Sequence, residues 1–200
     1  LRETPIVFTD LETSELIKYA ANSFLATKIT FINEISDLCE KLGADDHDEA
    51  KGIGLDGRIG SKFLHPGPGY GGSCFPKDTL ALVQTATKVD SPLRIVEAVV
   101  EVNDKRKKSM AKKIINACSG NVTNKTLAIL GVTFKPNTDD MRDAPSLDII
   151  PTLQAEGAII NAYDPEGMNA AKSVLKDVSW CNDAYQAMEG ANAVAILTEW

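Results

Sequence analysis

The alternation of short apolar runs with helical segments after residue 125 constrains the fold more than any other feature of this sequence. Strands are predicted at residues 126–132, 158–163, 178–181 and 193–197, and helices at 145–156, 168–175 and 184–188. Strands that alternate with helices form a parallel sheet with the helices on its faces. We therefore expect an α/β unit whose ligand site lies beyond the carboxyl ends of its strands.

A long amphipathic segment near the N-terminus is the second constraint. Between residues 13 and 42 apolar side chains recur at intervals close to 3.6, and Gly43 stands where a left-handed helix cap is expected. Candidates for the N-terminal cap are Thr13, Ser14 and the Thr9–Glu12 capping box. A helix of about 30 residues is about 45 Å long, more than a small domain needs for itself. We expect it to pack between subunits.

The region between these two parts is predicted to be helical or sharply bent. Its expected elements are a short helix at 45–54, a loop rich in glycine and proline at 55–70, a helix that begins near Pro76 and a helix at 92–118. The character of the chain changes at Ser119. We therefore divide it into a helical unit, 1–118, and an α/β unit, 119–200.

Composition limits the classes of function. The net charge of −7 argues against a nucleic-acid binder, and we interpret the one basic cluster, residues 105–108, as a solvated helix face. No apolar run approaches the roughly 20 residues of a membrane span, and the N-terminus lacks the apolar stretch of a signal peptide. These features predict a soluble, cytoplasmic protein that binds neither nucleic acid nor membrane.

The four cysteines are scattered without a Cys-x-x-Cys pair, and the chain has two histidines. Neither a zinc site nor a disulfide scaffold is expected, and no metal is predicted. Cys39 and Cys118 occupy apolar helical phases and are interpreted as core residues, and Cys181 is expected to end a strand. Cys74 differs from these three because of its neighbours.

Cys74 lies at the end of a glycine-rich run and directly before a predicted helix. Glycines at 67, 69, 71 and 72 let the backbone approach a ligand closely. The free amides and positive dipole at the start of a helix stabilise a thiolate, and Lys77 adds positive charge. Asp78, four residues on, can orient or deprotonate the thiol. These features indicate a nucleophile, and the alternative is a buried structural cysteine.

Lys18 and Asn22 are four residues apart on the long helix, so their side chains project from one face. Both can donate a hydrogen bond to one oxygen. Such a pair can stabilise the negative charge that develops in hydride or acyl transfer. The alternative is a pair of polar residues on an exposed stripe.

Four motifs occur in order along the chain: ELIKYAAN at 15–22, IGLDGRIG at 53–60, FLHPGPGYGGSCFPKD at 63–78 and LGVTFKP at 130–136. Together they resemble the UDP-glucose/GDP-mannose dehydrogenase family across essentially the whole chain. The resemblance implies a helical dimerisation and substrate domain with a long central helix, followed by a Rossmann-like, parallel-sheet UDP-binding domain that is incomplete here.

The resemblance also implies a reaction and roles for the residues above. The family oxidises the C6 alcohol of UDP-glucose to the carboxylate of UDP-glucuronate, with two NAD+ and water. By matching motif, Cys74 attacks the C6 aldehyde and forms a thiohemiacetal and then a thioester, which water hydrolyses. Lys18 and Asn22 match the oxyanion-stabilising pair, and Asp78 matches the carboxylate that assists the cysteine and the water.

Substrate and cofactor contacts follow from the same resemblance. The substrate loop is matched by Phe63, Leu64, His65, Pro66, Gly67 and Gly71. Arg58 resembles an arginine that reaches the substrate of a neighbouring subunit, which implies a homodimer through the long helix. Phe134 and Lys135 resemble uridine-nucleotide contacts. Lys77 and Arg142 resemble NAD contacts, and an ion pair of Arg142 with Asp139 or Asp143 is the alternative.

Parts of the family pattern are missing. No Gly-x-Gly-x-x-Gly follows a strand, so we expect the principal NAD domain to precede Leu1 and the chain alone to show little or no turnover. A Thr and a Glu that transfer protons in the family, and a later Arg that contacts the nucleotide, are absent, and His65 replaces a lysine found in some relatives. The rival interpretations are a GDP-mannose or UDP-N-acetylhexosamine dehydrogenase, a non-catalytic nucleotide-sugar-binding or dimerisation module, and a peroxide-sensing thiol.

Overall fold

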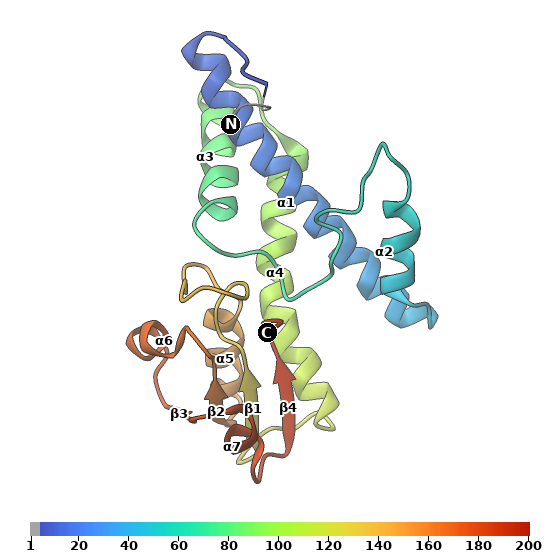
Figure 1. Ribbon diagram of the computed structural model, residues 1–200. Helices are drawn as coiled ribbons and strands as arrows, with labels where there is room; N and C mark the ends of the chain where they lie inside the picture. The colour runs from blue at the N-terminus through green and yellow to red at the C-terminus, as the bar shows by residue number, and fades with distance from the viewer. Residues whose placement is uncertain (1–4) are drawn as a thin grey trace.

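The computed structural model describes residues 5–200, which form a helical unit stacked on an α/β unit (Figure 1). The four residues of the predicted helical domain that precede Pro5 lie outside the described part. The helices of the first unit are α1 (Leu11–Leu42), α2 (Asp46–Gly54), α3 (Phe75–Lys88) and α4 (Arg94–Ala117). The second unit contains β1 (Thr126–Leu130), α5 (Ser146–Ala155), β2 (Ile159–Tyr163), α6 (Met168–Val174), β3 (Val178–Trp180), α7 (Ala184–Met188) and β4 (Ala193–Ile196).

The long helix α1 confirms the predicted amphipathic segment, with one correction at its start. The N-terminal cap is Asp10, whose side chain accepts a hydrogen bond from the Thr13 amide at 2.7 Å, so neither the hydroxyl candidates nor the capping box were right. An aspartate at this position satisfies a free amide and favours the positive end of the helix dipole. Gly43 ends the helix in the left-handed conformation, as expected, at φ 71°.

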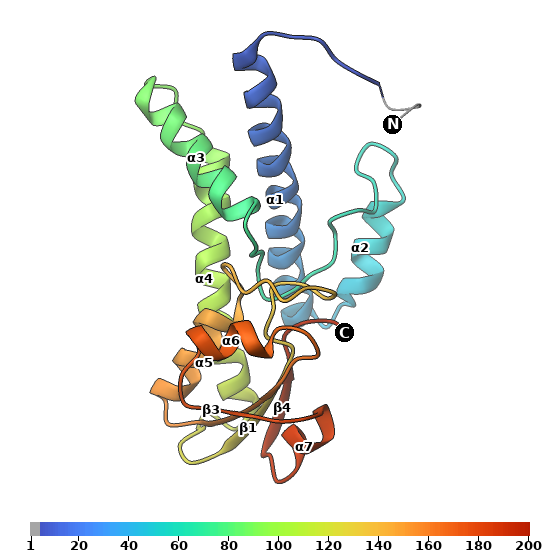
Figure 2. The same ribbon diagram turned by 60° about the vertical axis from the view of Figure 1, so that its left-hand side comes forward.

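One face of α1 is apolar and exposed. α1 packs against α3 and α4 on its other side (Figure 2). The exposed face carries Ile17, Phe24, Phe31 and Leu38, each half or more exposed and each seven residues from the next. A seven-residue repeat of large apolar side chains keeps them on one stripe of a helix.

The second unit is a parallel four-stranded sheet of order β3-β2-β1-β4. The predicted α/β alternation is therefore confirmed. The two faces of β1 belong to different cores: Leu127 and Ile129 pack with α4 and α5, and Ala128 packs with α7 and Cys181. Helices therefore cover both faces of the sheet, as its buried central strands require.

Helix α4 joins the two units. Its first half packs on α1 and α3, and its second half contributes Met110, Ala111 and Ile114 to the core of the α/β unit. In both views it runs from the top of the helical unit down beside the sheet (Figures 1 and 2). A single rigid helix shared by two cores fixes how the units sit on each other.

The basic cluster on α4 corrects the prediction of a solvated face. Arg106 and Lys107 are only 8% and 5% exposed, whereas Lys105 and Lys108 face solvent. Buried cations need partners, and both of these have them in loops far away in the sequence. None of the helices between residues 5 and 200 is long and apolar enough to cross a membrane.

Candidate active site

Cys74 is exposed and is the residue directly before the first turn of α3. Pro76 occupies that first turn, where its missing amide proton leaves no hydrogen bond unmade. The Sγ atom lies 3.8 Å from the hydroxyl of Ser73. The other cysteines, Cys39, Cys118 and Cys181, are buried, and burial raises the pKa of the Cys39 and Cys181 thiols. Cys74 is thus the accessible thiol among residues 5–200, and it stands at a helix start.

A buried carboxylate lies one turn further along α3. Asp78 is 5% exposed at its side chain, and its Oδ2 atom accepts a hydrogen bond from Asn22 Nδ2 at 2.5 Å. Lys18 Nζ lies 3.7 Å from the same oxygen, and Lys77 Nζ lies 3.7 Å from Oδ1. The predicted pair on α1 therefore converges on one oxygen, which belongs to Asp78.

This cluster brings together four residues that the sequence placed in one site. Asp78 donates its backbone amide to the carbonyl of Cys74 at 2.9 Å, so the thiol and the carboxylate share the first turn of α3. In the described part of the chain the Cys74 thiol and the Asp78 carboxylate share no hydrogen bond. A carboxylate held by an amide and two ammonium groups, next to an exposed thiol, can orient water or a polar substrate group at the sulfur.

Two of the glycines before Cys74 pack against the α/β unit, a contact that the sequence did not predict. A Cβ atom on Gly71 would lie 2.3 Å from the carbonyl oxygen of Asp143, and one on Gly72 would lie 2.7 Å from the ring of Phe134. The Gly72 amide donates to the carbonyl of Arg142 at 2.8 Å. These two glycines let the loop pack directly against the α/β unit, so their close backbone approach is to protein.

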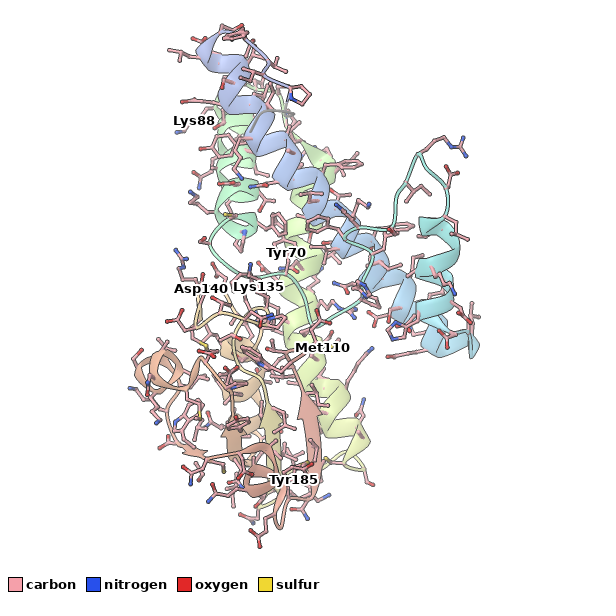
Figure 3. The ribbon with its side chains drawn as sticks, in the orientation of Figure 1. Tyr70, Lys88, Met110, Lys135, Asp140 and Tyr185 are labelled. Carbon is pink, nitrogen blue, oxygen red and sulfur yellow. The ribbon has the colours of Figure 1, made fainter. Side chains whose placement is uncertain are left out.

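The predicted nucleotide residues lie on the other side of this junction. Phe134 and Lys135 follow the carboxyl end of β1, where ligands of parallel sheets bind, and Lys135 Nζ lies 5.3 Å from the centre of the Phe134 ring. Tyr70, Lys135 and Asp140 gather where the two units meet (Figure 3). The loop that ends in Cys74 thus touches the segment 134–143.

Arg142 is held by a carboxylate that the sequence did not indicate. Its guanidinium donates to both oxygens of Asp140 at 2.9 and 2.7 Å, so the predicted partners Asp139 and Asp143 were wrong. The hydrogen bonds to Asp140 raise the pKa of Arg142 and lower the pKa of Asp140. The Arg142 side chain remains 68% exposed, so its cation is still accessible.

The remaining substrate-loop residues are spread along the chain that leads to Cys74. Phe63 has a left-handed backbone (φ 64°) and an edge contact with Phe75 at 6.1 Å between ring centres. Leu64 is buried and His65 is exposed. Pro66 and Gly67 lie on the wall of a cleft of about 450 Å³ between α1, α2, α4 and β4.

Arg58 is not brought to the Cys74 cluster in one chain. Its guanidinium is 90% exposed and is paired with Asp56 at 2.6 Å, and this contact raises the pKa of Arg58. The loop that carries it is tied to α1, because Lys28 donates to the carbonyls of Ile59 and Gly60. Arg58 therefore points into solvent from a fixed loop.

The sequence interpretation missed Asp164, which is fully buried after β2. Its oxygens accept hydrogen bonds from the amides of Val132, Thr133, Glu166 and Gly167. In dinucleotide-binding sheets an acidic residue of this kind binds a ribose hydroxyl. In this chain the Asp164 carboxylate instead accepts hydrogen bonds from backbone amides, and it fixes the loop that leads to Phe134. Its position directly after a strand was the signal available in the sequence.

Three further polar residues were also missed: Asn33, Asn103 and Arg106, which contact the loop before Cys74. Nothing local in the sequence distinguishes them from surface residues of an amphipathic helix. No group of three or more His, Cys, Asp or Glu side chains within residues 5–200 is arranged to hold a metal ion.

The fold and the site together define a class of protein: a helical unit joined to a parallel α/β unit, with an exposed cysteine in the loop at the junction. Two family models match the chain, the UDP-glucose/GDP-mannose dehydrogenase family central domain over residues 12–105 and the UDP binding domain of the same family over residues 128–200. The chain belongs to the UDP-glucose/GDP-mannose dehydrogenase family.

Individual relatives agree with this assignment. The UDP-glucose 6-dehydrogenase of Rhizobium meliloti (strain 1021) is 59% identical over 200 residues, which are 100% of this chain and 46% of the relative. UDP-glucose 6-dehydrogenase TuaD of Bacillus subtilis (strain 168) is 51% identical over 98% of this chain and 42% of its own length. A UDP-glucose dehydrogenase structure from the hyperthermophilic archaeon Pyrobaculum islandicum superimposes with a TM-score of 0.93 at 36% identity, over 99% of this chain and 46% of that one. The chain therefore spans about half the length of the relatives it matches.

Proposed function

We propose that the chain carries the substrate site and the nucleophile of an NAD-dependent UDP-glucose 6-dehydrogenase, which oxidises the C6 alcohol of UDP-glucose to the carboxylate of UDP-glucuronate. The observation that carries the proposal is the cluster of Cys74, Asp78, Lys18 and Asn22 at the start of α3. The identity to UDP-glucose 6-dehydrogenases over the whole chain supports the choice of substrate.

Cys74 is the proposed covalent residue. Its sulfur adds to C6 of the aldehyde formed by the first oxidation, and the proton goes to the aldehyde oxygen, which gives a thiohemiacetal. The second oxidation removes a hydride and a proton and leaves a thioester. Water then adds to the thioester carbon, the C–S bond breaks with the Cys74 thiolate as the leaving group, and the sugar carboxylate is released as the thiolate takes up a proton. An exposed thiol at a helix start suits this role, because free amides there favour the thiolate.

Lys18 and Asn22 are the proposed donors to the C6 oxygen, which carries negative charge when sulfur or water adds to its carbon. They already converge on one oxygen, that of Asp78, at 3.7 and 2.5 Å. A substrate oxygen can therefore accept hydrogen bonds from Lys18 and Asn22, which lie on one face of α1. Asp78 is the proposed base for the hydrolytic water, since it lies one helical turn from Cys74.

Nucleotide and sugar contacts are proposed on both sides of the junction. Phe134 and Lys135 suit a uridine ring and a phosphate, since an aromatic face and a cation follow the carboxyl end of β1. The loop residues Phe63, Leu64, His65, Pro66, Gly67 and Gly71 are proposed to surround the sugar and pyrophosphate.

NAD would supply the hydride acceptor for both oxidations. Lys77 and Arg142 fit its phosphate groups, because both side chains are largely exposed cations beside the loop of Cys74. The α/β unit does not fit a dinucleotide, because the acidic residue after β2 is fully used by protein amides. We therefore expect this chain alone to bind UDP-glucose and to form little or no NADH from it.

A homodimer through α1 is the proposed assembly. Ile17, Phe24, Phe31 and Leu38 form an exposed apolar stripe of the kind that soluble proteins cover with a partner. A twofold interface would pair this stripe with itself. It would also allow the exposed Arg58 to reach the site of the other subunit.

Ligand-dependent melting tests the substrate. A ligand at one hundred times its Kd stabilises the folded state by about 2.7 kcal/mol, which is roughly 5–10 °C for a chain of this size. We expect UDP-glucose to raise the Tm of the chain by this amount, and GDP-mannose or a UDP-N-acetylhexosamine to raise it less. A larger shift with either rival sugar, or none with UDP-glucose, would contradict the proposal.

The assembly is tested by sedimentation of Phe24→Glu. Burying one large aromatic side chain is worth about 1.5–3 kcal/mol, and a twofold interface contains it twice, so the dimer Kd should rise by at least about one hundredfold. Tyr185→Glu is the matched control, because Tyr185 is 82% exposed on α7, far from α1 (Figure 3). A dimer that survives Phe24→Glu, or a wild-type monomer, would refute this interface.

A further inference from the structure

Three buried polar side chains hold the backbone of the loop that leads to Cys74. Asn33 on α1 is 1% exposed, and Asn103 and Arg106 on α4 are 3% and 8% exposed. Each is directed at a main-chain group between Gly67 and Tyr70. We refer to Asn33, Asn103 and Arg106 as the loop clamp.

The Gly67 residue is held at both of its main-chain polar groups. Its amide donates to Asn33 Oδ1 at 2.7 Å, and its carbonyl accepts from Arg106 Nε at 2.5 Å. The Nη1 atom of Arg106 also donates to the Asn33 carbonyl and to Asp37 Oδ2, both at 2.9 Å. The guanidinium therefore ties α1, α4 and the loop together through one planar group with fixed directions.

The Tyr70 residue is held in the same way by one side chain. Its amide donates to Asn103 Oδ1 at 2.8 Å, and its carbonyl accepts from Asn103 Nδ2 at 3.1 Å. Between the two held residues, Gly69 has a φ of 116°, and a Cβ atom there would lie 3.0 Å from Asn103 Oδ1. The amide and carbonyl of Gly67 and of Tyr70, seven and four residues before Cys74, are thus fixed in direction.

These side chains contribute to stability, because an apolar residue in place of one of them would leave main-chain groups of Gly67 or Tyr70 without a partner. They also do more than stabilise the fold. What a buried hydrogen-bonded group adds is a defined direction for the groups it contacts. Here the contacted groups belong to the loop with the proposed sugar residues and the nucleophile.

We propose that Asn33, Asn103 and Arg106 are positioning residues that preset the sugar-binding loop before the substrate arrives. The inference rests on the proposed function, since it assigns the loop to the sugar. The clamp acts through the loop backbone and touches no reacting atom. It fixes the path of residues 67–70, and therefore where Cys74 and Gly71 stand relative to C6 and the pyrophosphate.

The test compares two clamp variants with matched controls in the 200-residue chain. Asn103→Ala removes both bonds to Tyr70, and Asn116→Ala changes an exposed asparagine of the same helix. Arg106→Lys keeps the charge and loses the planar fork, and Arg94→Lys makes the same change at an exposed arginine. The readouts are amide hydrogen exchange at Gly67 and Tyr70, and the Kd values for UDP-glucose and for UDP.

We expect amide exchange at Tyr70 in Asn103→Ala, and at Gly67 in Asn33→Ala, to be at least roughly tenfold faster than in the wild type, because each substitution removes the acceptor of that amide. Arg106→Lys should speed exchange at Gly67 less, because Asn33 still accepts from that amide. The Kd for UDP-glucose should rise roughly tenfold, about 1.4 kcal/mol, and the Kd for UDP should rise less, because UDP has no sugar to contact the loop and its uridine is proposed to bind the α/β unit. The two control variants should match the wild type in all three readouts.

A purely structural role predicts another pattern. Clamp variants with a lower Tm but unchanged exchange at these amides, or with equal loss of UDP and UDP-glucose affinity, would overturn the proposal. Asn33→Ala, which leaves the ion pair of Arg106 with Asp37 in place, decides the question if the other two variants unfold. A wild-type chain that binds no UDP-glucose contradicts the proposed function. Amide exchange alone then shows whether the loop clamp fixes the loop backbone.

Discussion

Gly71 is the position where a single methyl group should separate the two units. Its missing Cβ atom would stand 2.3 Å from the carbonyl oxygen of Asp143, 2.9 Å from that carbonyl carbon and 3.2 Å from Cβ of Phe134. The first of these is about 1 Å inside an ordinary van der Waals contact, and both atoms of the carbonyl are backbone. Gly71→Ala therefore has no flexible side chain to displace, so the loop and the segment 134–143 must move apart.

The cost follows from the two interactions that this movement disturbs. Adding a methyl group to a packed contact usually costs about 1–3 kcal/mol. The neighbouring hydrogen bond from the Gly72 amide to the Arg142 carbonyl, 2.8 Å long, is worth about 1 kcal/mol more if it breaks. We expect a loss of about 2–4 kcal/mol, which lowers the Tm by roughly 4–16 °C for a domain of this size.

Thermal unfolding followed by circular dichroism measures the change. Gly57→Ala is the control, because a Cβ atom there meets nothing within 4 Å and the backbone is not left-handed. Its Tm should stay within about 2 °C of the wild type, since exposed substitutions usually change stability by less than about 0.5 kcal/mol. A Gly71→Ala variant as stable as Gly57→Ala would refute the close packing of loop and α/β unit.

Two further outcomes are expected. Asp164→Ala should lower the free energy of unfolding in denaturant by about 3–5 kcal/mol, because it leaves four backbone amides without their acceptor. Glu166→Gln, at an exposed neighbour, should be neutral. Equal stability of the two variants would contradict this role of Asp164. Burial works to raise the pKa of Asp37, but hydrogen bonds and charge from Lys113 and Arg106 outweigh it and lower that pKa. The ionised carboxylate therefore stabilises the fold above about pH 4 and loses this effect as the pH falls through its lowered pKa. The Tm difference between the wild type and Asp37→Asn should shrink between pH 7 and pH 3, and a constant difference would refute the ion pair.

The elements of the fold could be read from local patterns. The spacing of apolar residues in α1 and the left-handed Gly43 are properties of a few neighbouring residues, and so is the alternation that forms β1 to β4. The cap at Asp10 was missed because several hydroxyl and carboxylate residues in a row all suit a cap. Only the backbone conformation distinguishes them.

The contacts around the candidate site depended on partners far away in the sequence. The charged residues around Arg106 have the pattern of a solvated helix face. Arg106 is nevertheless buried, because its guanidinium donates to the carbonyl of Gly67, 39 residues earlier in the chain. Gly71 and Gly72 have the spacing of a ligand loop, and their close contacts are with Phe134 and Asp143 of the other unit. The family motifs identified which residues gather near Cys74, and the tertiary structure shows what each one contacts.

The central claim is that Cys74 is the nucleophile in a UDP-glucose site, and alkylation of the chain tests it most directly. Quantitative mass spectrometry after brief treatment with iodoacetamide reports each cysteine separately. We predict fast labelling of Cys74 and slow labelling of the buried Cys39, Cys118 and Cys181. Saturating UDP-glucose should protect Cys74, and GDP-mannose should protect it much less. Labelling of Cys74 that UDP-glucose does not slow, at a concentration that raises the Tm of the chain, would contradict the claim.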